Sequence, residues 1–196
     1  MKNGYVDEIR KRLNAAIQGL PPGFYNTFDY VATGNNRCHS STLGLLAPII
    51  AGLEGVASIG IDVPLKRGAA KMKPDVVGYD AEGREIVYVD FESPNSSDAR
   101  VKIKDIDPYV AYRVSEAPPV PYVIITSLPD CASPEWQLRW TSGQQYNHQF
   151  RGMGEKLRKN PFQFWRTRWR TMLSDIDMSG ITLLNIDRKS VEPVKL

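Results

Sequence analysis

Two acidic residues, Asp90 and Glu92, stand two positions apart in the segment "REIVYVDFESPNSSD" and could act together in chemistry. The residues before them are rich in Val, Ile and Tyr, which predicts a strand. Side chains at positions i and i+2 of a strand point to the same face. The two carboxylates would therefore share one face, while Val89 and Phe91 pack on the other. A third acid, Asp75, opens the preceding predicted strand in "PDVVGYD".

Clustered carboxylates need a source of positive charge, because without one they repel each other and raise one another's pKa. Hard cations such as Mg²⁺ take oxygen ligands, typically one or two carboxylates together with water and substrate phosphate. Basic side chains are the alternative source, and Lys102 and Lys104 stand near the beginning of the next predicted helix. A lysine beside a metal-bound water can orient the nucleophile and stabilise the negative charge that develops on phosphorus.

The elements that must position these residues follow from hydrophobic periodicity and from turn residues. The turn "DAEGR", with Gly83, joins the strands of Asp75 and Asp90 into a predicted hairpin, which brings the acids close together. The expected order is helix, helix, strand, strand, strand, helix, strand, helix, strand, over residues 5–19, 43–54, 56–65, 74–80, 84–92, 96–115, 118–128, 160–173 and 180–187. This order predicts a mixed α/β fold with a central sheet flanked by helices.

The segment "KPDVVGYDAEGREIVYVDFESPNSSDARVKIKD" resembles the PD-(D/E)XK nuclease superfamily, which has the restriction-endonuclease-like fold. Asp75 matches the first aspartate of the family, and Asp90 matches its second acid. The third place, two residues further on, is normally lysine and is Glu92 here, although some members carry an acid there. Other members have moved the lysine onto the following helix. In one large bacterial group of restriction-endonuclease-like proteins a lysine and then a tyrosine follow there, and Lys104 and Tyr109 are similar to these.

That bacterial group also reads acid-x-aliphatic-Ser-Pro before its helical lysine. Ser93 and Pro94 match the Ser-Pro pair, although Glu92 replaces the aliphatic residue. By this likeness, Lys104 is the first choice for the catalytic lysine and Lys102 is the second.

The resemblance implies a metal site for Mg²⁺ or Mn²⁺. Its ligands would be Asp75, Asp90 and the carbonyl oxygen of Phe91, while Glu92 would bind the metal or a water. In such proteins an acid near the end of the first core helix can join the metal site, and Glu54 is the matching position. Taken from the residues alone, Glu54 is also typical of an exposed helix end.

The resemblance further implies a core of the order α-β-β-β-α-β. This order fits a core of roughly residues 40–128 within a single domain of residues 1–196. The helix at residues 5–19 would precede the core, and residues 129–196 would form a helical and basic extension after it.

The function implied by the resemblance is hydrolysis of phosphodiester bonds in nucleic acid, with DNA as the first choice of substrate. Asp75, Asp90, Glu92 and Lys104 would be the catalytic residues. One alternative is a catalytically degenerate domain of the same fold, which binds nucleic acid or protein without cutting, because position 92 lacks the lysine. Another alternative is a protein-interaction domain in which the acids and lysines form a structural network.

Basic side chains in two regions, together with Lys102, could hold a phosphate backbone by charge neutralisation and counterion release. The residues predicted for this role are Lys66, Arg67, Lys71, Lys73, Lys102, Arg166, Arg168 and Arg170. A solvated helix face is the alternative for the arginines of residues 160–173. Trp165 and Trp169 lie on the apolar stripe of that helix, so we expect them to be buried.

Composition limits the remaining possibilities. The formal net charge of +3 permits a nucleic-acid partner without requiring one. No apolar run is long enough to span a bilayer, and no signal peptide is apparent, so we expect a cytoplasmic protein without a membrane partner. A homodimer is an open alternative to the monomer, because nucleases that cut both strands are frequently dimers. Cys38-His39 suggests zinc, but no second ligand pair has the spacing of a zinc finger.

Overall fold

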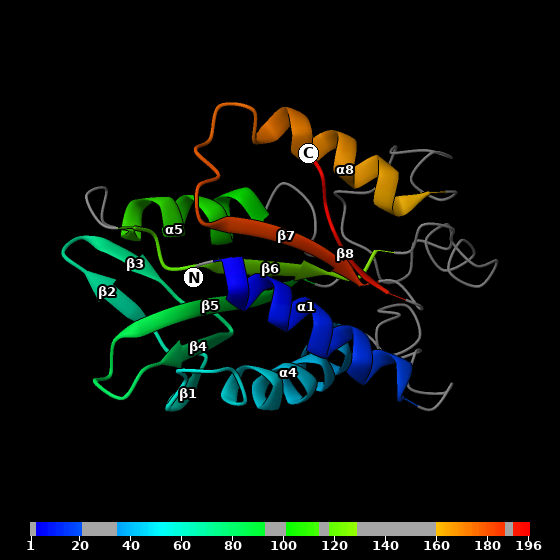
Figure 1. Ribbon diagram of the computed structural model, residues 1–196. Coiled ribbons are helices and arrows are strands. Elements are labelled where there is room, and N and C mark those ends of the chain that lie inside the picture. The colour runs from blue at the N-terminus through cyan, green and yellow to red at the C-terminus, as the bar shows by residue number, and fades with distance from the viewer. Residues whose placement is uncertain (1–2, 21–34, 93–100, 114–117, 129–159, 187–189) are drawn as a thin grey trace.

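The computed structural model describes residues 3–20, 35–92, 101–113, 118–128, 160–186 and 190–196. A mixed six-stranded sheet runs through this part of the chain, with helices on both of its faces (Figure 1). The helical elements are α1 (Asn3–Gln18), α4 (Asn35–Ala51), the π-helical turn η2 (Lys102–Ile106), α5 (Asp107–Tyr112) and α8 (Pro161–Met172). The strands are β1 (Ser58–Ile61), β2 (Leu65–Arg67), β3 (Ala70–Met72), β4 (Val76–Tyr79), β5 (Glu85–Glu92), β6 (Tyr122–Thr126), β7 (Ile181–Ile186) and β8 (Val191–Pro193). The predicted α/β class with a central sheet flanked by helices is confirmed.

The strand order in the central sheet is β1-β4-β5-β6-β7-β8, and β2 and β3 form a separate two-stranded sheet. Strands β1, β4 and β5 are antiparallel neighbours, β6 and β7 continue parallel to β5, and β8 is antiparallel to β7. The predicted hairpin between β4 and β5 is present. Its turn has Gly83 at φ 76°, a backbone conformation that favours glycine, and the amide of Asp80 bonds the carbonyl of Arg84 at 3.0 Å.

Side chains alternate between the two faces of the sheet, so the core has two layers. Figure 1 shows α1 and α4 on one face of the sheet and α5 and α8 on the other. Val87, Val89 and Phe91 of β5 pack in the layer that contains α1 and α4. Tyr88 packs in the opposite layer with α5 and with the two tryptophans of α8, Trp165 and Trp169, which are buried as predicted. Asp90 and Glu92 follow the same alternation as Tyr88, so their carboxylates face the α5 side of the sheet.

Three local features differ from the sequence predictions. The second helix begins at Asn35 rather than Leu43, and β2, β3 and β8 were not predicted. The helix expected over residues 96–115 is a π-helical turn followed by the short helix α5 in its described part. Pro108 lies in the first turn of α5 and lacks the N–H that a continuous α-helix would need there, which explains the irregularity. The Ser93-Pro94 pair and residues 129–159 of the predicted extension lie outside the described residues.

Candidate functional site

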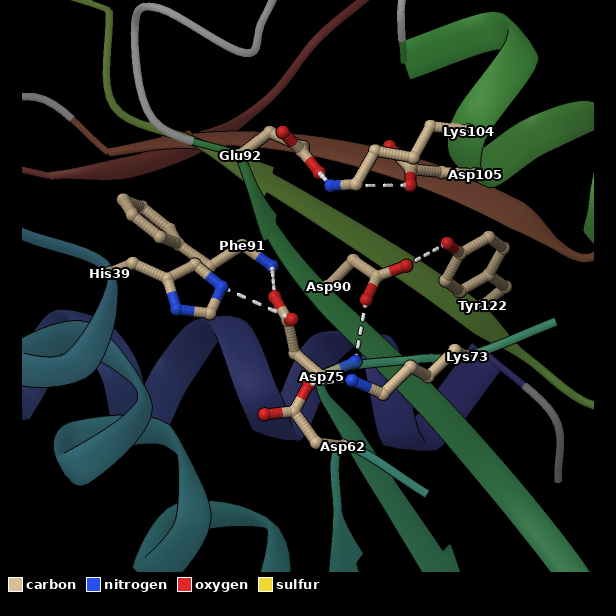
Figure 2. Close-up of polar contacts among 10 residues, drawn as sticks. All are labelled: His39, Asp62, Lys73, Asp75, Asp90, Phe91, Glu92, Lys104, Asp105 and Tyr122. Atoms are coloured by element: carbon tan, nitrogen blue, oxygen red, sulfur yellow. Dashed lines mark hydrogen bonds and ion pairs between the residues drawn. The ribbon is translucent and has the colours of Figure 1, made fainter. Parts of the chain in front are cut away.

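The two aspartates of the predicted site face each other across the β4–β5 hairpin. Asp75 directly precedes β4, and the pairing of Val76 with Val89 brings it opposite Asp90. The amide of Asp75 donates to Oδ1 of Asp90 at 2.6 Å, and the amide of Phe91 donates to Oδ2 of Asp75 at 2.7 Å (Figure 2). Both side chains are buried. Backbone amides therefore fix the positions of both carboxylates before any ligand arrives.

Burial makes Asp90 an unusual acid. Desolvation and the negative charge of Asp75 raise the pKa of Asp90 to about 7, although the hydroxyl of Tyr122 donates a hydrogen bond to its Oδ2. Desolvation and the charge of Asp90 also raise the pKa of Tyr122, so this hydroxyl keeps its proton and remains a donor. The raised pKa of Asp90 therefore comes first from its burial and then from the charge of Asp75.

Glu92 and Lys104 meet beside the aspartates. Glu92 is 2 % exposed at the end of β5, and its Oε1 accepts a hydrogen bond from the ammonium of Lys104. Lys104 lies in η2, and its Nζ is 3.8 Å from Oδ1 of Asp105, the next residue (Figure 2). Partial burial lowers the pKa of Lys104, but the charges of Asp105 and Glu92 outweigh this effect and raise it above its ordinary value. The lysine is therefore a cation at every physiological pH.

Besides Tyr122, two residues of this cluster were missed by the sequence analysis as members of the acid site. The Nε2 atom of His39, on α4, lies 3.1 Å from Oδ1 of Asp75, and this hydrogen bond raises the pKa of the histidine. Asp105 is 4 % exposed, and burial together with the charges of Glu92 and Asp90 raises its pKa to about 10. Neither belongs to a sequence motif. The only signal for Asp105 was its position directly after the predicted lysine.

Glu54, the weakest predicted ligand, lies away from the cluster. It follows the C-terminal end of α4, where its carbonyl accepts a hydrogen bond from Tyr5, whereas His39 lies near the N-terminal end of the same helix. The amide of Ala57, three residues after Glu54, bonds the carbonyl of Tyr79, at the opposite end of β4 from Asp75. A helix advances about 1.5 Å per residue, so the length of α4 separates Glu54 from the acids.

The basic residues predicted to bind nucleic acid divide into two groups. Arg67 donates to the carbonyl of Tyr112 and lies over its ring, Lys73 pairs with Asp62 at 3.0 Å, and Lys102 pairs with Asp107 at 2.8 Å. These three side chains have structural partners. Lys66 and Lys71 instead stand opposite each other on the exposed β2–β3 hairpin. Two like charges directly opposed on a hairpin are unfavourable unless an anion binds there.

The three arginines of α8 have different environments. Arg166 donates to the carbonyl of Lys195 at 2.7 Å, and the guanidinium of Arg168 lies 5.4 Å from the ring centre of Trp165. Arg170 is exposed in the last turn of the helix. Among these three arginines, Arg170 is therefore the one whose side chain is exposed to solvent.

The donor chemistry of the cluster fits a hard divalent cation. Asp75, Asp90, Glu92 and Asp105 offer carboxylate oxygens, and burial together with neighbouring negative charges raises the pKa of Asp90 and of Asp105. In the described residues, however, no group of three histidine, cysteine or acidic side chains is arranged to hold a metal ion. The carboxylates of Asp75 and Asp90 are turned towards amides, His39 and Tyr122 instead.

Comparison with known proteins adds no relative. No protein-family model, curated protein or solved structure matches the chain. Among the helices of the described residues, none is both long and apolar enough to cross a membrane.

Proposed function

We propose that the chain is a metal-dependent nuclease that hydrolyses phosphodiester bonds of nucleic acid, with DNA as its substrate and Mg²⁺ or Mn²⁺ as its cofactor. One observation carries this proposal. Asp75, Asp90, Glu92 and Lys104, named from the sequence motif, come from three separate elements and gather at one end of the β4–β5 hairpin (Figure 2). A cluster of buried acids with one lysine is the donor set that phosphodiester hydrolysis by a metal-activated water needs.

The order of the elements supports the same proposal. Helix α4 is followed by the antiparallel strands β1, β4 and β5, then by η2 and α5, and then by β6, which is parallel to β5. This is the α-β-β-β-α-β order that the resemblance implies. The β2–β3 hairpin stands between β1 and β4 along the chain, and α1, α8, β7 and β8 lie outside this order.

The residues have distinct roles in this proposal. The carboxylates of Asp75 and Asp90, with the carbonyl of Phe91, would hold the cation, which would supply an activated water and neutralise charge on the phosphate. The ammonium of Lys104 pairs with Glu92, while the lysine side chain is 61 % exposed. It can therefore neutralise Glu92 before substrate binds and move towards the phosphate afterwards. Once it is released from Glu92, the ammonium can orient the attacking water or stabilise the negative charge that develops on phosphorus.

A non-catalytic binding domain of the same type is the second candidate. The observation that favours it is the closed network, in which each of the four carboxylate oxygens of Asp75 and Asp90 already accepts or shares a hydrogen bond. A carboxylate oxygen has two lone pairs, so these bonds do not exclude a cation. The two candidates differ in one measurable property, which is metal-dependent cleavage.

The test is cleavage of supercoiled plasmid and of a labelled single-stranded oligonucleotide in Mg²⁺, in Mn²⁺ and in EDTA. Asp75→Asn and Asp90→Asn remove the ligands, and Asp175→Asn, at an exposed acid after α8, is the matched control. We expect cleavage in a divalent cation, loss of cleavage in the first two variants and no change in the third. Cleavage that persists in both ligand variants would refute the assignment. Salt-sensitive binding with no cleavage in any condition would favour the non-catalytic domain.

A further inference from the structure

A small cavity, here called the α8–β8 pocket, lies between α8 and the strands β7 and β8, on the face of the sheet that α8 covers (Figure 1). Its volume is about 240 Å³, and its lining includes Phe162, Arg166, Asn185, Glu192, Pro193 and Lys195. Sites for drug-sized ligands have volumes of roughly 300–1,000 Å³. The α8–β8 pocket therefore suits one small chemical unit.

Strand pairing places this pocket in line with the acid cluster. Glu92 is paired with Thr126 of β6, and Thr126 is paired with Asn185 of β7. Ile125 and Leu184, which precede these last two residues, pack in the layer of α1 and α4. Thr126 and Asn185 therefore point to the opposite face, which is the face of Glu92. Neighbouring strands lie about 4.8 Å apart, so Asn185 is about 10 Å from Glu92.

Asn185 provides a fixed hydrogen-bond donor in the pocket. Its side chain is buried, and its Oδ1 accepts from the hydroxyl of Thr126 and from the amide of Leu128, both at 2.9 Å. Its Nδ2 donates to the carbonyl of Leu128 at 2.9 Å. An amide nitrogen carries two hydrogens, and no acceptor within the described ranges takes the second one. A ligand in the pocket can accept this hydrogen.

Two cations line the same pocket. The Nε of Arg166 donates to the carbonyl of Lys195 at 2.7 Å, which leaves the two terminal guanidinium nitrogens for a ligand. The ammonium of Lys195 stands on an exposed side chain. The acid that lines the pocket, Glu192, pairs with Arg10 at 2.5 Å, so its charge is already balanced. The pocket therefore carries an excess of positive charge and favours an anion.

An aromatic ring completes the lining. Phe162 stands in the first turn of α8 and is only partly buried against the core. Aromatic side chains stack on nucleobases, while arginine and lysine neutralise phosphates. A ring, two cations and an amide donor in one small pocket are the groups that recognise a nucleotide.

We propose that the α8–β8 pocket binds one nucleotide of the substrate strand, with its phosphate at Arg166 and Lys195 and its base against Phe162. The inference rests on the proposed function, because it gives the nuclease a second contact with the same strand. A strand in duplex geometry rises about 3.4 Å per nucleotide, so the distance of about 10 Å from Glu92 corresponds to about three nucleotides. The pocket would thus anchor the strand beside the acids and fix which phosphate reaches them.

The experiment measures binding in EDTA, where metal-dependent cleavage cannot occur. Saturation-transfer NMR follows deoxyadenosine 5′-monophosphate, with deoxyadenosine and inorganic phosphate as partial probes. Fluorescence anisotropy follows a labelled single-stranded oligonucleotide. We expect the monophosphate to bind wild type more tightly than either partial probe, because the base and the phosphate each contribute contacts.

Three variants remove these contacts one at a time. Arg166→Gln and Phe162→Leu should each weaken binding of the monophosphate and of the oligonucleotide by about tenfold. Lys195→Gln should weaken both by about threefold, because this ammonium is exposed to solvent. The control Lys11→Gln removes an exposed cation of α1, on the other face of the sheet, and should change neither. Circular dichroism verifies folding, and Lys195→Gln reports on the pocket even if Arg166→Gln does not fold.

The outcomes separate this inference from the nuclease proposal. Binding of the monophosphate that is equal in wild type and in all three variants, or absent from wild type, would overturn the pocket and leave the nuclease standing. Variants that weaken binding of the monophosphate but not of the oligonucleotide would show a site for a free nucleotide and overturn the contact with the strand. Weaker binding of both probes, in a protein that cleaves no substrate in Mg²⁺ or Mn²⁺, would support the pocket and overturn the nuclease.

Discussion

Removal of the Lys104 ammonium should destabilise the metal-free protein through Glu92. Glu92 is 2 % exposed and shares its surroundings with two other buried carboxylates, Asp90 and Asp105, so Lys104→Met leaves a buried charge without its ammonium. Breaking a buried ion pair by removal of one partner costs about 3–5 kcal/mol. Lys104 itself is 61 % exposed and therefore screened by water, which reduces the expected loss to about 2 kcal/mol.

A double-mutant cycle isolates this interaction. Glu92→Gln removes the charge that the lysine neutralises, so the double variant Glu92→Gln/Lys104→Met should be more stable than the sum of the single changes predicts, by about 1–2 kcal/mol. Urea unfolding at pH 8 in EDTA, followed by the fluorescence of the buried Trp165 and Trp169, measures each free energy of unfolding. Lys66→Met, at an exposed lysine of β2, is the control and should change stability by less than about 0.5 kcal/mol. Additive effects of the two changes would refute the pairing of Glu92 with Lys104.

Three further predictions concern pH, the histidine and a glycine. The folded-state pKa of Asp105 is raised to about 10, so its contribution to stability is full below the unfolded value near 4 and is lost as pH rises towards 10. The melting temperature of the metal-free protein should therefore fall between pH 5 and pH 9, and it should fall less in Asp105→Asn. An equal fall in both proteins would contradict the raised pKa of Asp105. The hydrogen bond to Asp75 raises the pKa of His39, so this bond is strongest when the histidine ring is protonated. His39→Ala should therefore lower the free energy of unfolding in urea by about 1 kcal/mol at pH 6 and by less at pH 9. A larger loss at pH 9 than at pH 6 would contradict the pair. Gly180 has φ 81°, and a Cβ added there would lie 2.5 Å from the Tyr109 hydroxyl, whereas Gly68 has φ 60° and open space around it. Gly180→Ala should therefore lower the free energy of unfolding, measured in urea, by about 2–4 kcal/mol, and Gly68→Ala by about 1 kcal/mol. Equal losses in the two variants would contradict the crowding at Gly180.

Local rules were sufficient for the acids of the hairpin. The period of two along β5 and the glycine turn at Gly83 predict that Asp90 and Glu92 share a face and that Asp75 lies close to them, and the structure places Asp75 opposite Asp90. These relations depend on residues that are close in sequence and on backbone geometry alone. The same reasoning predicted the buried stripe of α8.

Residues that arrive from distant elements could not be predicted in this way. His39 and Tyr122 reach the aspartates over sequence separations of 36 and 32 residues, and their contacts depend on how α4 and β6 pack against β5. The sequence analysis did not single out Asp105, which lies buried in the π-helical turn before Pro108. The strands β2, β3 and β8 have only three residues each, too few for a period of two to be visible.

Metal-dependent cleavage by wild type and by Asp90→Asn, compared under single-turnover conditions with labelled duplex DNA, tests the central claim most directly. Asp90 accepts the amide of Asp75 and the hydroxyl of Tyr122, and an asparagine can keep one of these bonds while it loses the negative charge that a cation needs. Folding of the variant is verified by circular dichroism. We predict cleavage by wild type in Mg²⁺ or Mn²⁺ and cleavage by the variant no faster than in EDTA. Equal rates for the two proteins, or no cleavage by folded wild type in either cation, would contradict the account.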